Sequence, residues 1–205
     1  MEVQREAPSL PVAVKRLGQS RHQSGLTLLE LLITIAIVII MAVLSVPFFD
    51  SLARSHSDTA MHYLMREVQQ ARSSAVVAGK TVTLCGSEDN ESCTKNWQTG
   101  MHILVFIDSD ANRILDDDER LIRASNVPKG YFQWRGAGRN YLRFRQDGSV
   151  REMGTFTYCP PSKKADFARQ LTINRPGRSY YSRDRNGDRT HEANNSRDPI
   201  ACPDF

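Results

Sequence analysis

The sequence predicts an α+β protein in which one long N-terminal helix precedes an antiparallel β-sheet head. Two observations predict this order: an uncharged apolar segment near the start of the chain, and a change near residue 80 from helical periodicity to short alternating segments. With 205 residues, the chain has room for one sizeable domain and an appendage. Its net charge of +4 is too mild to indicate nucleic acid by itself. Because the apolar residues are concentrated near the N-terminus, a uniformly soluble cytosolic enzyme is excluded.

The apolar segment from Leu26 to Phe49 is the first element. Its 24 residues would extend about 36 Å as a helix, which is enough to cross a hydrocarbon core of ~30 Å. Glu30 is the one charged residue in it. Because a carboxylate inside a spanning helix costs roughly 2.5–3.5 kcal/mol, we expect Glu30 to have a partner or a function. The alternative is a carboxylate close enough to the end of the span to reach the lipid headgroups.

Residues 1–25, which precede this segment, are polar and basic, with four positive and two negative side chains. Basic residues beside a span stay on the cytoplasmic side, so the N-terminus is expected inside and the remainder outside. A secretory signal peptide, cleaved near Ser45, is the alternative. It is disfavoured because Glu30 interrupts the apolar core and because the segment continues through Pro47 into a helical pattern.

Helical periodicity continues beyond Pro47, which is expected to kink the helix. The mostly small residues that recur on one face are Ala53, Ala60, Leu64, Val68, Ala71, Ala75 and Ala78. Gly79 can adopt a positive φ and is expected to end the helix. The head therefore begins with a helix over residues 50–78, whose small-residue face is expected to pack closely on a sheet.

Short alternating segments between Gly-, Asn- and Asp-rich turns then predict strands at residues 81–85, 101–107, 131–134, 141–144, 155–158 and 170–173. They predict a β domain over residues 80–175. An Arg-rich tail follows at residues 176–205.

The junction Gly25-Leu26-Thr27-Leu28-Leu29-Glu30 resembles the leader junction of type IV pilins and of the pseudopilins of type II secretion. The resemblance implies that prepilin peptidase cleaves between Gly25 and Leu26 and that the new N-terminus at Leu26 is methylated. Leu26 departs mildly from the Phe that is usual there. Residues 1–25 would be the cleaved leader, residues 26–49 the transmembrane and filament-core helix, and residues 50–205 the periplasmic head. Glu30 would be the carboxylate that pairs with the N-terminal amine of a neighbouring subunit during docking.

The head resembles the GspH/FimT group of pilin-like proteins. The segments that carry this resemblance are residues 71–75, 82–85 with Cys93, 97–100, 105–108, 144–148 and 154–159. The implied function is a structural one, as a minor pilin in a type IV pilus priming or tip complex. The alternatives are a FimT-like DNA-binding minor pilin in natural transformation, and an H-type minor pseudopilin of type II secretion. The implied partners are prepilin peptidase, other major and minor pilins, inner-membrane lipid and, in the second case, DNA.

All four cysteines lie beyond the apolar segment, on the oxidising side of the membrane, and their even number favours disulfides. Of the possible pairings we favour Cys85 with Cys93, which closes a local loop, and Cys159 with Cys202, which ties the tail to the head. Zinc is disfavoured because the spacings contain no C-x-x-C pair.

The segment from Asp108 to Glu119 partly fits a calcium loop, with acidic or amide residues at alternate positions. Arg113 stands where such a loop needs Gly, and a strand precedes it, so an acidic turn is the preferred prediction. Residues 184–192 are a weaker copy, for which we expect a solvated loop.

The tail combines Arg side chains with Tyr180 and Tyr181, a composition that suits contacts with phosphates and bases. Gly177 and Arg178 resemble half of the Gly-Arg-x-Arg pattern through which the FimT branch binds DNA. Arg183 and Arg185 are the candidates for the missing second Arg, although a solvated polar tail is favoured. The histidines are scattered and no nucleophile, zinc-protease or phosphate-loop motif occurs, so neither catalysis nor a cofactor or metal is predicted.

Overall fold

The computed structural model of the protein describes residues 26–94, 97–98, 101–136 and 140–202. The chain divides into two units, residues 1–44 and residues 45–205, and each is described by itself. The expected leader, residues 1–25, lies outside the described residues. Helix α1 spans Leu28–Ala78 and supplies residues to both units.

The C-terminus of α1 is formed as its sequence predicts. Gly79 has a φ of 62°, in the left-handed region that a residue with a Cβ rarely adopts. The Lys80 N–H donates to the Ala75 carbonyl at 3.3 Å. This bond, from the second residue past the helix to its last turn, is the Schellman arrangement and satisfies a carbonyl that the helix leaves unpaired.

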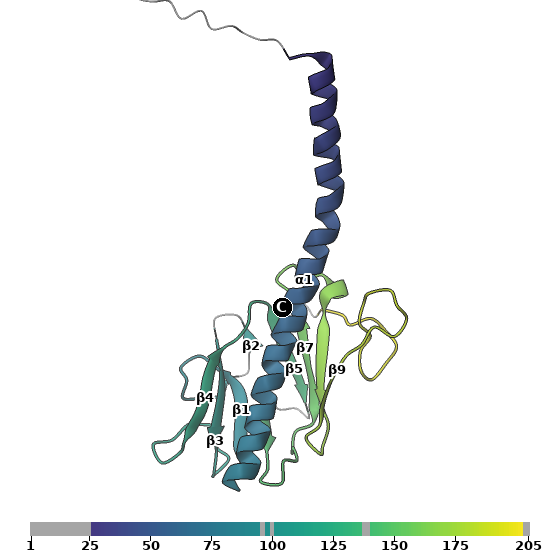
Figure 1. The fold of residues 1–205 in the computed structure, drawn as a ribbon. Coiled ribbons are helices and arrows are strands. Elements are labelled where there is room, and N and C mark those ends of the chain that lie inside the picture. The colour runs from purple at the N-terminus through teal and green to yellow at the C-terminus, as the bar shows by residue number, and fades with distance from the viewer. Residues whose placement is uncertain (1–25, 95–96, 99–100, 137–139, 203–205) are drawn as a thin grey trace, which may run out of the picture. The chain divides into compact units, whose positions relative to one another are not determined.

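Two antiparallel sheets make up the rest of the head (Figure 1). One has the order β4-β3-β1-β6 and the other the order β2-β5-β7-β8-β9. The strands are β1 Val82–Ser87, β2 Trp97–Gln98, β3 His102–Ile107, β4 Leu121–Asn126, β5 Tyr131–Gly136, β6 Tyr141–Phe144, β7 Gly154–Cys159, β8 Arg169–Ile173 and β9 Ser179–Tyr181. A short 3-10 helix, η1, covers Ala165–Phe167. The predicted α+β class, a long helix followed by antiparallel sheet, is confirmed.

The strands that the sequence analysis missed are edge strands. β4 lies at one edge of its sheet, and β2 and β9 lie at the two edges of the other. None of the six residues of β4 is buried. Edge strands need little apolar sequence, because only one neighbour and one face constrain them. These strands are defined by backbone pairing with a neighbouring strand, which no local sequence pattern reveals. Residues 121–126 of β4 pair with β3, and β9 pairs with β8.

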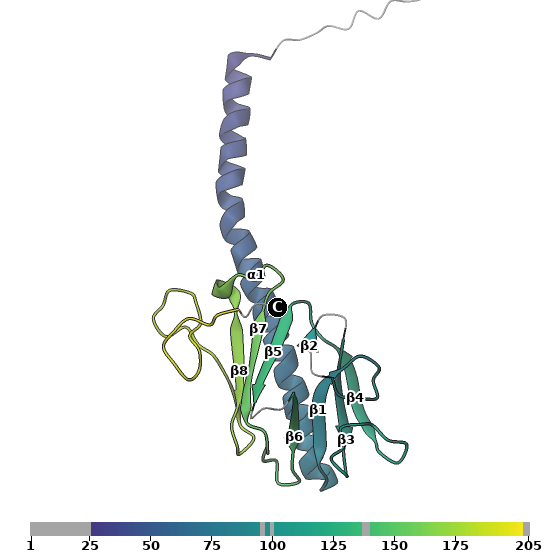
Figure 2. The same ribbon diagram turned by 180° about the vertical axis from the view of Figure 1, so that it is seen from behind.

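The core of the head lies between the second half of α1 and both sheets, as the views from the two sides show (Figures 1 and 2). Leu64, Ala71 and Ala75 are fully buried on α1, and Leu84 and Phe156 are fully buried on the two sheets. The face predicted from helical spacing is therefore the packed face, with the exception of half-exposed positions at its two ends.

Candidate functional site

The N-terminus of α1 is closed by a local cap. The Thr27 hydroxyl oxygen accepts a hydrogen bond from the Glu30 N–H at 3.2 Å, and the Thr27 carbonyl accepts one from the Leu31 N–H at 3.1 Å. Thr27 is therefore the N-cap, and Glu30 occupies the third helical position, the spacing of a capping box. The pattern Thr-x-x-Glu was readable in the sequence, where it was interpreted only as part of a cleavage junction.

Around Glu30, residues 26–44 expose only apolar and small uncharged side chains. Within the described part of the chain, α1 is the one helix long and apolar enough to cross a membrane. The exposed large apolar residues of this segment are Leu26, Leu28, Leu29, Leu31, Leu32, Ile33, Ile35, Ile37, Val38, Ile39, Ile40, Met41, Val43 and Leu44. A helix that is apolar all round has to be covered by lipid or by other helices. Gly25, the expected cleavage residue, lies outside the described residues.

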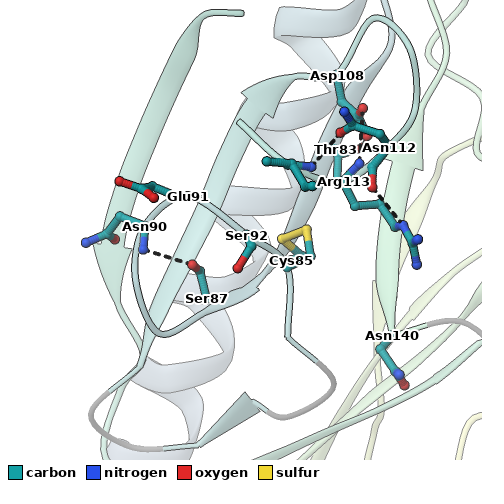
Figure 3. The surroundings of a disulfide bond; sticks show 12 residues. Thr83, Cys85, Ser87, Asn90, Glu91, Ser92, Asp108, Asn112, Arg113 and Asn140 are labelled. Atoms are coloured by element: carbon teal, nitrogen blue, oxygen red, sulfur yellow. Dashed lines mark hydrogen bonds between the residues drawn. A yellow bond between two sulfur atoms is a disulfide. The ribbon is translucent and has the colours of Figure 1, made fainter. Parts of the chain in front are cut away.

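Two disulfide bonds brace the head. Cys85 of β1 is joined to Cys93 across a sequence separation of 8, and Cys159 of β7 is joined to Cys202 across a separation of 43. These are the pairs named from the sequence. The first holds the β1–β2 loop against β1 (Figure 3), and the second holds the C-terminal segment against the end of β7.

The β1–β2 loop is organised by a single carboxylate. Asp89 accepts hydrogen bonds from the N–H groups of Ser92 and Glu91, both at 2.8 Å, and from the Ser92 hydroxyl at 2.7 Å. The backbone N–H groups of Ser92 and Glu91, in that order, hold the pKa of Asp89 well below its usual range. The loop therefore keeps its shape because a charged side chain satisfies its backbone donors.

The β3–β4 loop brings carboxylates together. Oxygen atoms of Asp108, Asp110 and Glu119 all lie within 4.8 Å of one another, close enough to share one cation. Arg113 adopts a φ of 72° at the position where a calcium loop has Gly, so the residue takes the backbone shape despite its Cβ. The oxygens of Asp108 already accept from the Thr83 hydroxyl and the Arg113 N–H (Figure 3). Burial, followed by the charges of Asp108 and Asp110, raises the pKa of Glu119.

The C-terminal loop repeats this arrangement with Asp184, Asp188 and Glu192, whose carboxylate oxygens also lie within 4.8 Å of one another. Glu192 is buried and accepts the Arg185 N–H at 2.8 Å. The Arg185 guanidinium donates to the Ser196 carbonyl at 3.1 Å. The loop closes on its own backbone, with Asp184 accepting from the N–H groups of Gly187 and Arg189.

Strand β9 separates Arg178 from the other two candidate DNA-contacting arginines. Arg178 precedes β9 and lines a surface depression with Arg72 of α1. Arg183 and Arg185 follow β9 and lie beside the acidic group of the C-terminal loop, where the Arg185 backbone N–H donates to Glu192. The sequence placed these arginines close together because they are neighbours in the chain, whereas β9 stands between them.

A polar cavity of about 290 Å³ lies where α1 meets β8 and β9. In it the Arg169 guanidinium is paired with the Asp58 carboxylate at 2.7 Å, and the Ser182 hydroxyl lies 3.0 Å from His191 Nδ1. Burial and then the Arg169 charge lower the pKa of His191. Ser182 Oγ also accepts the Gln170 N–H at 2.9 Å. The Arg169–Asp58 pair therefore fastens β8 to the helix, and Ser182, which follows β9, is bonded both to β8 and to His191 of the tail.

Comparison with protein families gives two matches. Residues 60–177 match the family described as type II transport protein GspH, and residues 20–46 match the prokaryotic N-terminal methylation motif. Among solved structures, the chain is similar to the type IV minor pilin FimU of Pseudomonas aeruginosa in two crystal forms. The identities are 19% and 20% over 62% of this chain, covering 92% and 88% of the FimU chains, with TM-scores of 0.46 and 0.45. No curated protein matches the chain.

Proposed function

The chain belongs to the GspH family of minor pilins and pseudopilins, and from this premise we propose that it is a structural subunit of a type IV pilus priming or tip complex. The family implies assembly with other pilins, and the methylation motif implies processing by prepilin peptidase. We place the head in the periplasm, because the basic leader favours a cytoplasmic N-terminus.

The capped start of α1 is the observation that carries this proposal. Cleavage after Gly25 leaves a free amine on Leu26, one residue before the N-cap Thr27. A positive charge at the N-terminus of a helix opposes the helix dipole. The carboxylate of Glu30 can offset it from the first turn of the same helix or from that of a neighbour. In apolar surroundings an unpartnered amine or carboxylate is costly, so subunits that pair them assemble more favourably.

Processing is tested by expressing the full chain with a prepilin peptidase. The protein should lose its first 25 residues, which intact-mass measurement detects. Gly25→Val should block the loss, because the added side chain obstructs the cleavage junction. A mature N-terminus near Val46 would instead establish a secretory signal peptide and contradict the proposal.

Docking is tested with Glu30→Ala, which should leave cleavage and membrane insertion intact and reduce incorporation into filaments. Thr27→Ala is the matched control, because it removes the hydroxyl that accepts the N–H of residue 30 and keeps the carboxylate. If Glu30 acts only through the stability of this helix end, the two variants should be similarly impaired. If it docks a neighbouring subunit, Glu30→Ala should be much the more severe.

DNA binding is the second candidate, and the exposure of Arg178 beside Arg72 favours it. For three or four phosphate contacts, log K should fall with log salt with a slope of roughly −3. Changing Arg178, Arg183 and Arg185 together to Ala should abolish a gel shift while thermal unfolding stays the same. Absence of any shift at low salt would remove this candidate.

A place in type II secretion is the third candidate, supported by the description of the matched family. Deletion of the gene separates the two machines. Loss of surface pili with normal protein secretion supports the pilus assignment, and the reverse result supports the secretion system.

A further inference from the structure

Six cationic side chains from distant parts of the sequence gather at the end of the head where α1 stops. We call this surface the basic end, and its members are Arg72, Lys80, Arg145, Arg151, Arg175 and Arg178. Asp147 is the one acidic side chain in the turns that carry them, apart from Glu152, which is buried and paired with Arg143. The six cations and Asp147 sum to a charge of about +5, which favours an anionic partner. The β3–β4 loop borders this surface, since Ser109 lines the same depression as Lys80 and Arg145.

Hydrogen bonds hold the basic end in one shape. Arg72 Nε donates to the Gly148 carbonyl at 3.0 Å, and Arg72 Nη2 donates to the Pro176 carbonyl at 3.2 Å. The Val150 N–H donates to the Arg175 carbonyl at 2.9 Å, which joins the β6–β7 and β8–β9 turns. The helix end and the two turns are thus tied to one another, so little order has to be gained on binding.

An apolar centre lies within the basic end. Val76 is 52% exposed and Val77 is 87% exposed, although both are large apolar residues of the last turn of α1. Val76 lies on the same helix face as Arg72, four residues before it, and both side chains lie against Gly148 of the β6–β7 turn. An apolar centre with a charged rim is the anatomy of a protein interface. Single-stranded nucleic acid prefers aromatic platforms, and the basic end as defined contains no aromatic side chain.

The same head carries a surface of opposite charge. We call it the acidic lobe, and its acidic residues are Glu88, Asp89, Glu91, Asp110, Asp116, Asp117, Asp118 and Glu119. Against these stand Arg113 and Arg120, which leaves about −6. The Leu115 N–H donates to the Glu91 carbonyl at 2.7 Å, and the Cys93 N–H to the Arg113 carbonyl at 3.1 Å, so the β1–β2 and β3–β4 loops form one lobe.

Two exposed apolar side chains also belong to the acidic lobe, Ile114 at 47% and Leu121 at 44% exposure. We propose that the basic end of one copy docks on the acidic lobe of a second copy, valines against Ile114 and Leu121, with the charged rims paired. The proposal rests on the proposed role as a subunit of an assembly. Because the two surfaces differ, the contact is heterologous and leaves one of each free for further subunits. It weakens with salt, and membrane anchoring raises the effective concentration at which it forms.

Zero-length carbodiimide cross-linking of the full chain in lipid nanodiscs tests the contact. Unlabelled and ¹⁵N-labelled copies are mixed, so that a cross-linked pair of one light and one heavy peptide can come only from two copies. We expect mixed pairs that join Lys80 to Asp117 or Asp118, in a yield that falls as salt is added. Cross-links within one copy alone, or mixed pairs that join Lys80 to carboxylates outside the acidic lobe, would overturn the proposal.

Charge reversal on both surfaces tests the contact in a second way. If two variants that fail to associate alone associate when mixed, misfolding cannot explain their separate failures. Arg145→Glu with Arg178→Glu, and separately Asp117→Lys with Asp118→Lys, should each lower the yield of mixed pairs about tenfold, because attraction becomes repulsion. Because the second variant lacks the carboxylates that cross-link to Lys80, association of both variants is measured without cross-linking, by the sedimentation of two-copy nanodiscs, and the tenfold loss refers to that measurement. Mixing the two variants should restore association, since each then offers a matching surface.

Arg183→Glu with Arg197→Glu is the matched control, with the same charge change on exposed arginines of the C-terminal loop, and it should associate like the unaltered chain. Failure of the mixed variants to associate would overturn the proposal. It would also be overturned if the unaltered chain gave no mixed pairs but shifted DNA in a gel, and the Arg145 and Arg178 variant lost that shift. Normal cleavage after Gly25 and normal dependence on Glu30 in the same samples would show that the proposed function stands without it.

Discussion

Removal of the Cys159–Cys202 disulfide should destabilise the head more than removal of Cys85–Cys93. A disulfide stabilises mainly by restricting the unfolded chain, and the effect grows with the loop that it closes. For the separation of 43 residues the loop-entropy relation gives about 4 kcal/mol at 25 °C, and for the separation of 8 it gives about 2.5 kcal/mol. Replacing each pair by Ala should therefore lower the free energy of unfolding by these amounts.

The longer bridge also fixes packing that the shorter one does not. Ile200 is buried in a small cluster with Cys159 and Ala168, away from the main core. If the tail detaches when its disulfide is lost, burial of Ile200 is lost as well, which adds roughly 1.5–3 kcal/mol. The ordering of the two variants is thus reinforced by the packing of the tail.

Urea unfolding of the full chain in detergent, followed by tryptophan fluorescence, measures both losses. The protein has two Trp residues, and both are buried in the head, Trp97 at 3% and Trp134 at 7% exposure. Alkylation with and without reductant first establishes that the unaltered head contains no free thiol. A loss below about 1 kcal/mol for the Cys159 and Cys202 variant, or the reverse order of the two variants, would refute the loop-entropy reasoning.

Arg143→Met should lower the free energy of unfolding by about 3–5 kcal/mol, measured by the same urea titration, because it leaves the buried Glu152 carboxylate without its partner at 3.0 Å. Asp89→Asn should reduce the loss of melting temperature that the unaltered protein shows on acidification. Because the pKa of Asp89 is lowered in the folded state, its stabilising contribution is present above the ordinary carboxyl pKa of about 4 and is lost as the pH falls through the folded-state pKa. An unchanged dependence of melting temperature on acid pH would contradict this. Gly177→Ala should lower the melting temperature, because φ is 76° and the new Cβ would lie 2.0 Å from the Gly148 carbonyl oxygen, whereas Gly187→Ala, at a similar φ with open space around it, should cost less.

The long helix and its end were readable from the sequence because their causes are local. A Cβ-free residue at Gly79 ends α1, and the recurrence of small residues selects the face that packs. Central strands such as β3 were also readable, since burial on both faces requires a continuous apolar run. Edge strand β4 was missed because its hydrogen bonds to β3, and not its side chains, define it.

The sequence by itself determined the order of the elements, the family and the positions of the junction, the carboxylate Glu30 and the four cysteines, because each depends on residue type or short spacing. Only the tertiary structure decided which charges act together. Arg178 is five residues from Arg183 in the chain, yet its neighbours in space are Arg72 and the β6–β7 turn. Strand pairing sets those positions. The residues that meet there can be separated in the chain by 104 positions, as Arg72 and Pro176 are, and no local pattern links them.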